Sequence, residues 1–432
     1  MKKRMLSTIM CLIVLLAVLV NFIGCFELAE ARSESESESV GETEPGADDL
    51  MADITQNEVI GSENIDAESI KASDFSLDLF KAANEDGKNT LISPVSVLCA
   101  LAMTANGADG QTLEQMESVL GMSTEELNVY HHAYLNSLSQ EEKYKLSLAN
   151  SIWFKDDASL AVNQGFLQIN ADYYGADIYK AKFDGQTLGD INGWVNNKTD
   201  GMIPEVLKEI PPGAIMYLIN ALAFDAEWET VYSEWDVYDG KFTREDGTVV
   251  DAQMMRGEDG VYIEDENATG FIKYYSGNKY AFVALLPNEG ISVSDYIASL
   301  DGESLQVTLN NPIYGAALYT SMPKFTVEYD VEMSEILKGM GMVDAFDSAS
   351  ADFSKLGQSA NGNIFINRVI HKTFIEVGEL GTRAGAATVV EMTEECAPSV
   401  IKQVNLDRPF VYMLIDCENN IPLFIGTLMD VE

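Results

Sequence analysis

The sequence predicts one large α+β domain behind an N-terminal extension. The chain has 432 residues, and 47% of them are hydrophobic, which is enough to build a sizeable core. Helical and strand patterns are mixed without the regular alternation of a βαβ series, and this favours an α+β architecture. There is no internal repeat, and no second linker follows about Ile70. Residues 71–432 are therefore expected to fold as a single domain.

The strongest local patterns predict several elements of this domain. Pro94 opens a run of apolar residues at helical spacing, which predicts a helix. Two long apolar runs predict strands that are buried on both faces, and two more around Asn419-Asn420 predict a hairpin. In order, the further expected elements are a helix over 192–207 with a turn at 211–213, strands over 217–224 and 280–286, and the hairpin strands 410–417 and 421–429.

The first 24 residues are expected to be an export signal. A basic stretch, residues 2–4, precedes an apolar run over about 9–26. Two endings compete: Ala29-Glu30-Ala31 is a signal-peptidase pattern, and Phe22-Ile23-Gly24-Cys25 resembles a bacterial lipobox in which Cys25 would be lipidated. Both endings predict a protein outside the cell, either secreted or anchored by lipid on the outer face of the membrane.

Residues 25–70 are expected to be an acidic, disordered tether. From Arg32 to Asp49 the sequence alternates Ser and Glu and then adds Gly and Pro, with almost no apolar residues. Such a segment cannot bury enough surface to offset the entropy of ordering.

Charge and cysteine content exclude several function classes. The formal net charge is −42, from 69 acidic and 27 basic residues, so a nucleic-acid partner is not expected. Of five cysteines, Cys99, Cys396 and Cys417 lie beyond the leader, an odd number without close spacing. This pattern gives neither a disulfide framework nor a metal site, and no cofactor is expected.

Histidine content gives an enzyme little support. The chain has three histidines, His131, His132 and His371, and none of the common catalytic or nucleotide-binding motifs. Only His371 is a plausible general base, and a hydrogen-bonded core histidine is the simpler interpretation. A hydrolase is therefore a distant alternative.

The segment Glu376–Ala397 has the composition of a loop and the alternation of a strand. Its centre, Gly381–Thr388, is almost wholly small residues, and the segment has no proline. In an extended conformation one face holds small or β-branched residues only, and the other holds the charges. The first face comprises Thr382, Ala384, Ala386, Thr388 and Val390, and the second comprises Arg383, Gly385, Ala387, Val389 and Glu391. The first face could pass beneath packed helices while the second stays in water, as loop insertion into a sheet requires.

From about Phe75 to the C-terminus, the sequence resembles the serpin family. No single motif is specific, but the ordered set is. In chain order it comprises Asn89-x-x-Ile92-Ser93-Pro94-x-Ser96, Gly107-Ala108-x-Gly110-x-Thr112-x-x-Gln115-Met116, Asn150, Asn192-x-Trp194-Val195, Thr199-x-Gly201, Asn220-Ala221, Phe224-x-x-x-Trp228, Pro323-Lys324-Phe325, Gly341-Met342, Ala345-Phe346, Ala351-Asp352-Phe353-Ser354, Val369-x-His371-Lys372, Glu376-Val377-x-Glu379-x-Gly381-Thr382, Pro409-Phe410 and Leu423-Phe424-x-Gly426.

The resemblance implies a fold and a mechanism. Serpins have three β-sheets, eight or nine helices and an exposed reactive-centre loop on a metastable native state. The implied function is suicide inhibition of a serine protease, with a cysteine protease as a second candidate. The protease is trapped as a covalent acyl-enzyme when the cleaved loop inserts into the central sheet. The protein is expected to be a monomer, and a non-inhibitory serpin-fold binding protein is the alternative.

The resemblance also assigns site residues. The hinge of the loop comprises Glu379, Gly381, Thr382, Ala384, Gly385, Ala386, Ala387 and Thr388. The polar cluster beneath the central strands, called the shutter, comprises Ser93, Ser96, Asn220 and His371. The breach, where insertion starts, comprises Trp228, Lys324 and Glu379, with an ion pair expected between the last two. The hinge departs from the family at Gly378, Leu380 and Arg383, and Arg383 falls on the outward face.

The scissile bond is expected near the end of the loop. Counting seventeen residues from Glu379, as in the family, gives Glu395–Cys396, and Cys396–Ala397 is the alternative. The first suits a protease that prefers acidic residues, and the second suits an elastase-like enzyme. A trypsin-like target is disfavoured because no Arg or Lys lies between Met392 and Ser399.

Overall fold

A computed structural model describes most of the chain. The described residues are 46–59, 65–138, 144–157, 160–211, 213–360, 362–382 and 400–431. They include nine α-helices and three sheets of four or more strands, which agrees with the expected α+β class. The predicted export signal 1–24, Cys25 and most of the predicted tether lie outside the described residues.

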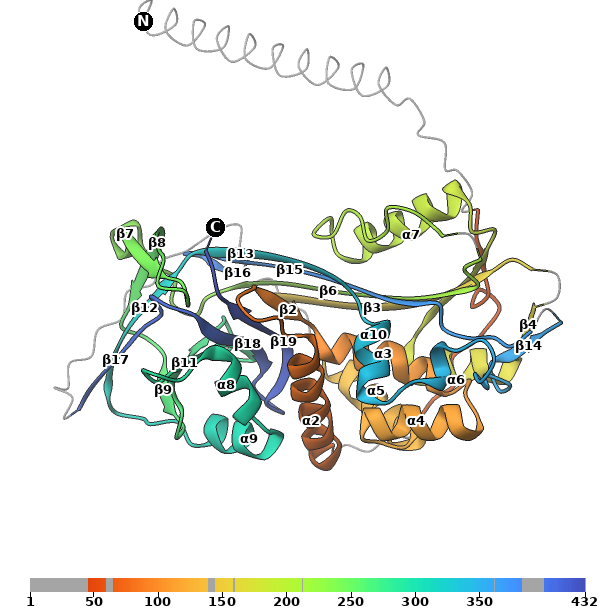
Figure 1. The fold of residues 1–432 in the computed structure, drawn as a ribbon, viewed down its shortest axis with the longest axis horizontal. Coiled ribbons are helices and arrows are strands. Elements are labelled where there is room, and N and C mark those ends of the chain that lie inside the picture. The colour runs from red at the N-terminus through yellow and green to blue at the C-terminus, as the bar shows by residue number, and fades with distance from the viewer. Residues whose placement is uncertain are drawn as a thin grey trace, which may run out of the picture. The chain divides into compact units, whose positions relative to one another are not determined.

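The largest sheet, sheet A, has seven strands and carries the candidate site (Figure 1). Its strands in spatial order are β1 (Asp48–Asp49), β5 (Asp177–Ala181), β3 (Tyr144–Lys155), β6 (Met216–Glu227), β16 (Gly381–Thr382), β15 (Arg368–Val377) and β13 (Phe325–Glu332). The predicted strand 217–224 is confirmed as the middle of β6, all but one of whose twelve residues are buried. Apolar residues on both faces let β6 lie at the centre of the molecule.

Two further sheets pack at one end of sheet A. Sheet B has six strands in the order β2 (Thr90–Ile92), β19 (Ile421–Leu428), β18 (Phe410–Asp416), β11 (Tyr280–Pro287), β10 (Ala268–Tyr274) and β9 (Val261–Glu264). Sheet C has four, in the order β17 (Ile401–Asn405), β12 (Ala317–Pro323), β8 (Val249–Gly257) and β7 (Val237–Thr243). A two-stranded pair joins β14 (Gly357–Ser359) and β4 (Leu160–Val162). The predicted strand 280–286 and the C-terminal hairpin are confirmed as β11 and as β18–β19.

Helices cover both faces of sheet A, while α8 and α9 lie beside sheet B (Figure 1). One face is covered by a group that includes α3, and the other by α7. The helices are α2 (Asp66–Ala83), α3 (Pro94–Ala105), α4 (Gly110–Leu120), α5 (Thr124–Ser137), α6 (Gln164–Tyr174), α7 (Gly185–Lys198), α8 (Val293–Ser299), α9 (Gly302–Asn310) and α10 (Ser334–Met340). The helix predicted from Pro94 is confirmed as α3, and every one of its residues is buried. None of the helices in the described ranges has both the length and the apolar character needed to cross a bilayer.

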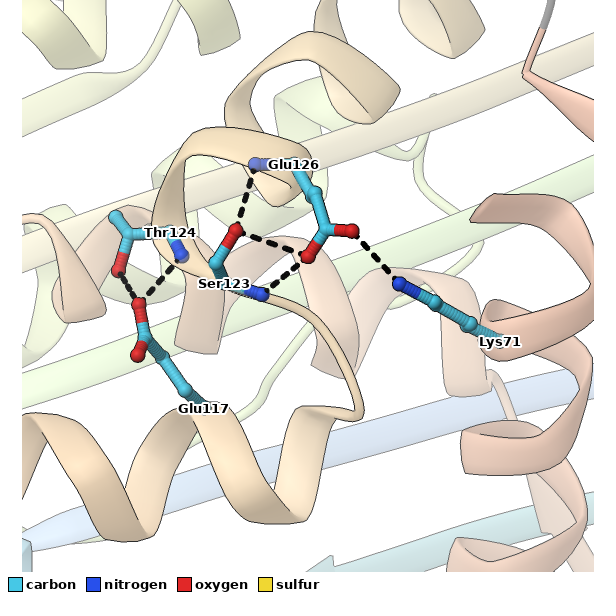
Figure 2. Close-up of polar contacts among 5 residues, drawn as sticks. All are labelled: Lys71, Glu117, Ser123, Thr124 and Glu126. Atoms are coloured by element: carbon cyan, nitrogen blue, oxygen red, sulfur yellow. Dashed lines mark hydrogen bonds and ion pairs between the residues drawn. The ribbon is translucent and has the colours of Figure 1, made fainter. Parts of the chain in front are cut away.

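Polar contacts fix the start of α5 and join it to its neighbours (Figure 2). Ser123 and Glu126 form a reciprocal capping box, in which each side chain accepts from the other residue's backbone N–H. Lys71 of α2 pairs with Glu126 at 2.7 Å, and Glu117 of α4 accepts hydrogen bonds from the backbone and hydroxyl of Thr124. These contacts link α2, α4 and α5 through the N-terminus of α5.

The predicted boundary of the disordered tether is wrong at its C-terminal part. Residues 46–59 are packed on the domain: Asp48 and Asp49 extend sheet A beyond β5, and the Leu50 N–H donates to Ile178 O at 2.9 Å. Asn57 then binds Asp172 of α6 through its backbone and its side chain. Backbone pairing at a sheet edge does not depend on apolar side chains, so the acidic composition of this segment did not reveal it.

The predicted helix 192–207 is also wrong in its bounds. The observed α7 begins after the Asp184 cap and ends at Lys198. Asp200 and Gly201 both have positive φ, 49° and 77°, which ends the helix. The Asn192 side chain then accepts hydrogen bonds from the backbone of Val206 and Leu207, which ties the non-helical segment back to α7.

Candidate functional site

The centre of sheet A is paired differently at its two ends. At one end β6 and β15 pair directly in parallel, with residues 217–221 opposite residues 368–372. At the other end the short strand β16 lies between them and runs antiparallel to both. Its Thr382 is opposite Ala226 of β6 and Val377 of β15. The first residues of the predicted hinge therefore already occupy the position of a central strand.

At Gly381 the backbone conformation and the close approach of β6 leave room only for glycine. Its φ is 153°, and a Cβ atom there would lie 2.0 Å from the carbonyl oxygen of Ala226. Any larger residue would push β16 away from β6. The hinge glycine is thus required by close backbone approach.

Thr382 points to the inner face of the sheet, as the alternation of the sequence predicts. It is 1% exposed, and its hydroxyl shares a hydrogen bond with the hydroxyl of Tyr275. The Tyr275 ring in turn stacks on the Trp228 ring at 4.4 Å. The inward face of the hinge therefore begins in a buried aromatic environment.

The three predicted breach residues lie together around the segment 378–380. The Trp228 indole N–H donates to Gly378 O at 2.9 Å, and the Trp228 backbone N–H donates to Leu380 O at 2.9 Å. Lys324 and Glu379 form the expected ion pair at 2.7 Å, with each side chain a little over one third exposed. The hydrogen bond from Lys324 holds the pKa of Glu379 below its ordinary value. These contacts hold the chain at the point where it turns into β16.

Sequence reasoning missed a buried lysine behind the breach. The ammonium group of Lys273 is 1% exposed, pairs with Asp259 and donates to Thr230 O at 2.9 Å. It also lies 4.4 Å from the centre of the Tyr232 ring and 5.4 Å from that of Trp228. Burial lowers the pKa of Lys273. In the sequence, Lys273 is the one basic residue of a strand that is otherwise apolar or neutral. Because long basic side chains usually keep their charged ends in solvent, this pattern does not predict a buried ammonium group.

The four predicted shutter residues form one connected cluster beneath β6 and β15. The Ser93 N–H donates to His371 Nε2 at 3.0 Å, and the Ser96 hydroxyl donates to Asn220 Oδ1 at 3.1 Å. His371 Nδ1 and Asn220 Oδ1 are 2.6 Å apart. All four residues are fully buried.

This geometry fixes the chemistry of His371. Nε2 accepts a backbone hydrogen bond, so Nδ1 carries the proton and donates to Asn220. Burial lowers the pKa of His371 to about 3, which keeps the ring neutral near pH 7. Neither ring nitrogen is available to take a proton from a nucleophile, and the histidine joins β15 to β6 instead.

Asn150 of β3 extends this cluster. It lies directly opposite Asn220 in the β3–β6 ladder. Its Oδ1 and the Nδ2 of Asn220 are both buried and have no hydrogen-bond partner among the described residues. An unsatisfied carbonyl acceptor and an unsatisfied amide donor thus belong to two directly opposed residues at the centre of the sheet. The sequence motif contained Asn150 without indicating this pairing.

The outer face of sheet A differs from the expectation that it would stay in water. Ile219 and Ala221 of β6 and Ile370 of β15 form a buried cluster with Trp194 and Val195 of α7. Near β16 this face is more open, since Glu376 is exposed and Asp225 is half-buried. An inserting strand would therefore have to pass beneath α7 where β6 and β15 pair directly with each other.

The rest of the predicted loop lies outside the described residues. This applies to the hinge residues Ala384, Gly385, Ala386, Ala387 and Thr388, and to Glu395, Cys396 and Ala397 of the candidate scissile bonds. Among the residues that the structure does describe, there is no group of three potential metal ligands.

Comparisons with known proteins agree with one another. Residues 71–431 match the family model described as serpin (serine protease inhibitor). The chain is 30% identical to the plasma serine protease inhibitor of Bos taurus over 366 residues, which covers 82% of this chain and 88% of that protein. It also has the fold of thyroxine-binding globulin in complex with thyroxine, at 23% identity and a TM-score of 0.74 over 84% of this chain and 99% of that one.

A thermophilic serpin, tengpin, offers a comparison with two states of one protein. Its native state matches with 49% identity and a TM-score of 0.85, covering 89% of this chain and 99% of tengpin. Its latent state matches with 44% identity and a TM-score of 0.74, covering 88% and 100%. The described structure is thus more similar to the native state than to the latent one.

Proposed function

The chain belongs to the serpin family, and we propose that it traps a serine protease by inserting its cleaved loop between β6 and β15. One observation carries the proposal. At one end of β6 and β15, Thr382 already lies between Ala226 and Val377, whereas residues 217–221 and 368–372 of the same two strands pair directly with each other. A cleaved chain that continued in the same direction would replace the direct β6–β15 pairing. A cysteine protease is the second candidate target.

The register of β16 predicts where each inserted residue would lie. Thr382 is opposite Ala226 and Val377, so an extended continuation pairs residues 382–391 with all of β15, down to Arg368. Against β6 the same continuation ends at residue 392, opposite Met216. The loop thus has the length needed to fill the position between the two strands.

Charges along the loop agree with this register. Arg383 would lie between Asp225 of β6 and Glu376 of β15, and Glu391 would lie beside Arg368. Opposite charges directly across a ladder stabilise strand pairing. Arg383, which departs from the family pattern, therefore favours insertion in this chain.

The same register brings Thr388 to the shutter. It would lie between Asn220 and His371, which now face each other across the β6–β15 pairing. The hydrogen bond between their side chains must break for the strand to enter. Insertion replaces it with new ladder hydrogen bonds and buried apolar surface, so the native state is held by a kinetic barrier.

The register also bears on the scissile bond. Since pairing with β6 and β15 ends at residues 392 and 391, cleavage beyond residue 392 would release enough chain for full insertion. Glu395–Cys396 meets this condition and suits a protease that prefers acidic residues. Cys396–Ala397 meets it too and suits an elastase-like protease.

We further propose that the protein acts as a monomer outside the cell, secreted or held by lipid on Cys25. The N-terminal charge pattern and the apolar run support export. Mass spectrometry of the mature N-terminus tests this, because lipidated Cys25 and a chain starting after Ala31 differ in mass and sequence.

The experiment for the inhibitory function is denaturing electrophoresis after mixing the protein with four proteases: elastase-like, acidic-residue-specific, subtilisin-like and trypsin-like. We expect a stable band near the summed mass with one of the first two, and intact mass spectrometry then locates the cut. A protease whose active-site serine is blocked is the control and should give no band. Loop cleavage by every protease, without a band and without a rise in thermal stability, would instead indicate a non-inhibitory serpin-fold binding protein.

A further inference from the structure

The outer face of sheet C carries an exposed group of large side chains, which we call the aromatic face. It comprises Trp235, Tyr238, Arg256, Tyr319 and Ile401. Trp235 is 87% exposed, and Ile401 is 69% exposed. Tyr238 and Tyr319 are each about two-fifths exposed, at 40% and 41%.

These side chains lie next to one another on a single face. Arg256 is directly opposite Ser321 in the β8–β12 ladder, and the Tyr238 hydroxyl lies 2.8 Å from Ser321 Oγ. Tyr319 precedes Ser321 by two residues and so lies on the same face. The parallel register of β12 and β17 puts Ile401 on that face as well.

Trp235 joins the group through Arg256. The guanidinium group of Arg256 donates to Trp235 O at 3.4 Å and lies 5.8 Å from the centre of the Tyr238 ring. Within the described ranges Arg256 forms no ion pair, although the chain as a whole carries a net charge of −42. One positive group therefore lies among exposed aromatic rings.

The composition of the aromatic face is typical of a protein–protein interface. Tryptophan, tyrosine and arginine are the residues most enriched where truncation weakens binding most. The chain has four tryptophans, and the other three, Trp153, Trp194 and Trp228, are buried. Leaving the fourth in water gives nothing to the stability of the fold, and a contiguous exposed apolar patch often marks a binding site.

The position of the aromatic face selects its occupant. In the sequence, residues 383–400 join β16 of sheet A to β17, and β17 forms one edge of sheet C. The candidate residue Cys396 is five residues from Ile401, and five residues span at most about 18 Å. A protease bound at that bond must lie within this distance of the aromatic face.

We propose that the aromatic face is a docking surface for the body of the target protease, separate from the loop that its active site grips. The proposal rests on the proposed inhibitory function. A second copy of this chain is the competing occupant, because Ile401 lies on an edge strand. The tryptophan, the arginine and one tyrosine lie away from that edge, on or beside β7 and β8, and favour a partner that covers the whole face.

The test compares Trp235→Ala, and Trp235→Ala combined with Tyr319→Ala, with the unchanged full chain. The protease is the one that forms the covalent band in the mixing experiment. We expect the second-order rate constant for complex formation to fall at least about tenfold in the double variant. The same protease should cleave a free synthetic peptide of residues 388–400 at an unchanged rate, since that peptide lacks the aromatic face.

Val343→Ala is the control, because Val343 is a half-exposed apolar residue beside α10, outside sheet C. Each variant should still show the rise in thermal stability after loop cleavage, which excludes a defect in folding or insertion. An unchanged rate constant in the double variant overturns the proposal. A self-association of the unchanged chain that the double variant loses, without a change in rate, assigns the face to a second copy and also overturns it. The absence of any covalent band with the unchanged chain is a different result and contradicts the inhibitory function itself.

Discussion

Single residues decide whether the loop can become a strand. Gly381 and Thr382 meet this requirement in different ways: the glycine allows backbone contact with Ala226, and the threonine fills a buried site beside Tyr275. The residues that follow must satisfy the same two faces of sheet A. Their side chains can therefore be tested one at a time.

Arg383→Glu should slow insertion. In the extended register it would bring a third carboxylate between Asp225 and Glu376, where like charges directly across a ladder destabilise pairing. We expect insertion to slow roughly tenfold, since exposed pairs each contribute up to about 1 kcal/mol. The measurement is the number of inhibitor molecules consumed per protease trapped, which should rise. Arg383→Glu combined with Glu376→Lys restores opposite charges and should recover trapping; without that recovery, the register is wrong.

Thr388→Arg should turn the inhibitor into a substrate. The register brings residue 388 between Asn220 and His371, which are fully buried, and an unpaired charge there costs several kcal/mol. The trapped fraction, measured by densitometry of the covalent band, should fall more than about tenfold while loop cleavage continues. Thr388→Ser is the control and should trap normally. Full trapping by Thr388→Arg would contradict the assigned inward face.

At the scale of elements, the sequence predicted α3 and the most apolar strands, and failed where tertiary contacts override local patterns. The strands β6, β11, β18 and β19 have long apolar runs, which indicate burial on both faces of a sheet. The end of α7 and the pairing of β1 with β5 depend instead on distant polar partners, such as Asn192 for residues 206–207.

The candidate site divides in the same way. The breach and shutter residues were found through ordered motifs, and the structure brings the members of each group into contact. Lys273 was missed because a lysine in a strand carries no sequence signal for burial. The covering of the outer face by α7 was missed because alternation indicates which residues share a face, but not what packs on it.

The N-terminus of α5 gives a prediction about pH. Hydrogen bonds from Lys71 and Ser123 lower the pKa of Glu126 to about 2, so its carboxylate is bound more strongly in the folded state (Figure 2). Its contribution is fully present above the unfolded value, near pH 4.5, and is lost as the pH falls from there toward 2. Because the side chain is 39% exposed, we expect Glu126→Gln to cost about 1 kcal/mol at pH 7, comparable to the loss of a helix cap.

The measurement is the half-life of the native fold at a fixed elevated temperature, at pH 7 and at pH 3. The Gln variant should lose its fold faster at pH 7 and differ less from the unchanged chain at pH 3. Glu125→Gln removes the same charge from an exposed neighbouring position and is the matched control. If both variants behave alike, net charge is responsible and the capping contact is not.

At the scale of the whole molecule, β6 and β15 of sheet A pair directly at one end, and β16 lies between them at the other. The direct β6–β15 pairing, the shutter hydrogen bonds and the cover of α7 oppose further entry. The hinge, the register and the matched charges favour it. The native fold is thus expected to be a kinetically held state whose more stable form contains the inserted loop.

Cleavage of the loop by a protease that escapes trapping should therefore stabilise the protein. Residues 383–391 would pair with β15 on one side and β6 on the other, and each ladder hydrogen bond contributes about 1 kcal/mol net, which offsets the entropy of ordering the strand. A large domain gains about 2 °C for each kcal/mol, so a net gain of about 3 kcal/mol would raise the unfolding midpoint by about 6 °C, and we expect a rise of at least that size. Circular dichroism melts of intact and cleaved protein measure this, and cleaved Thr388→Arg should show little or no rise. If intact and cleaved protein of the original sequence had equal midpoints, the loop would stay outside sheet A after cleavage. The proposed trapping mechanism would then have no driving force.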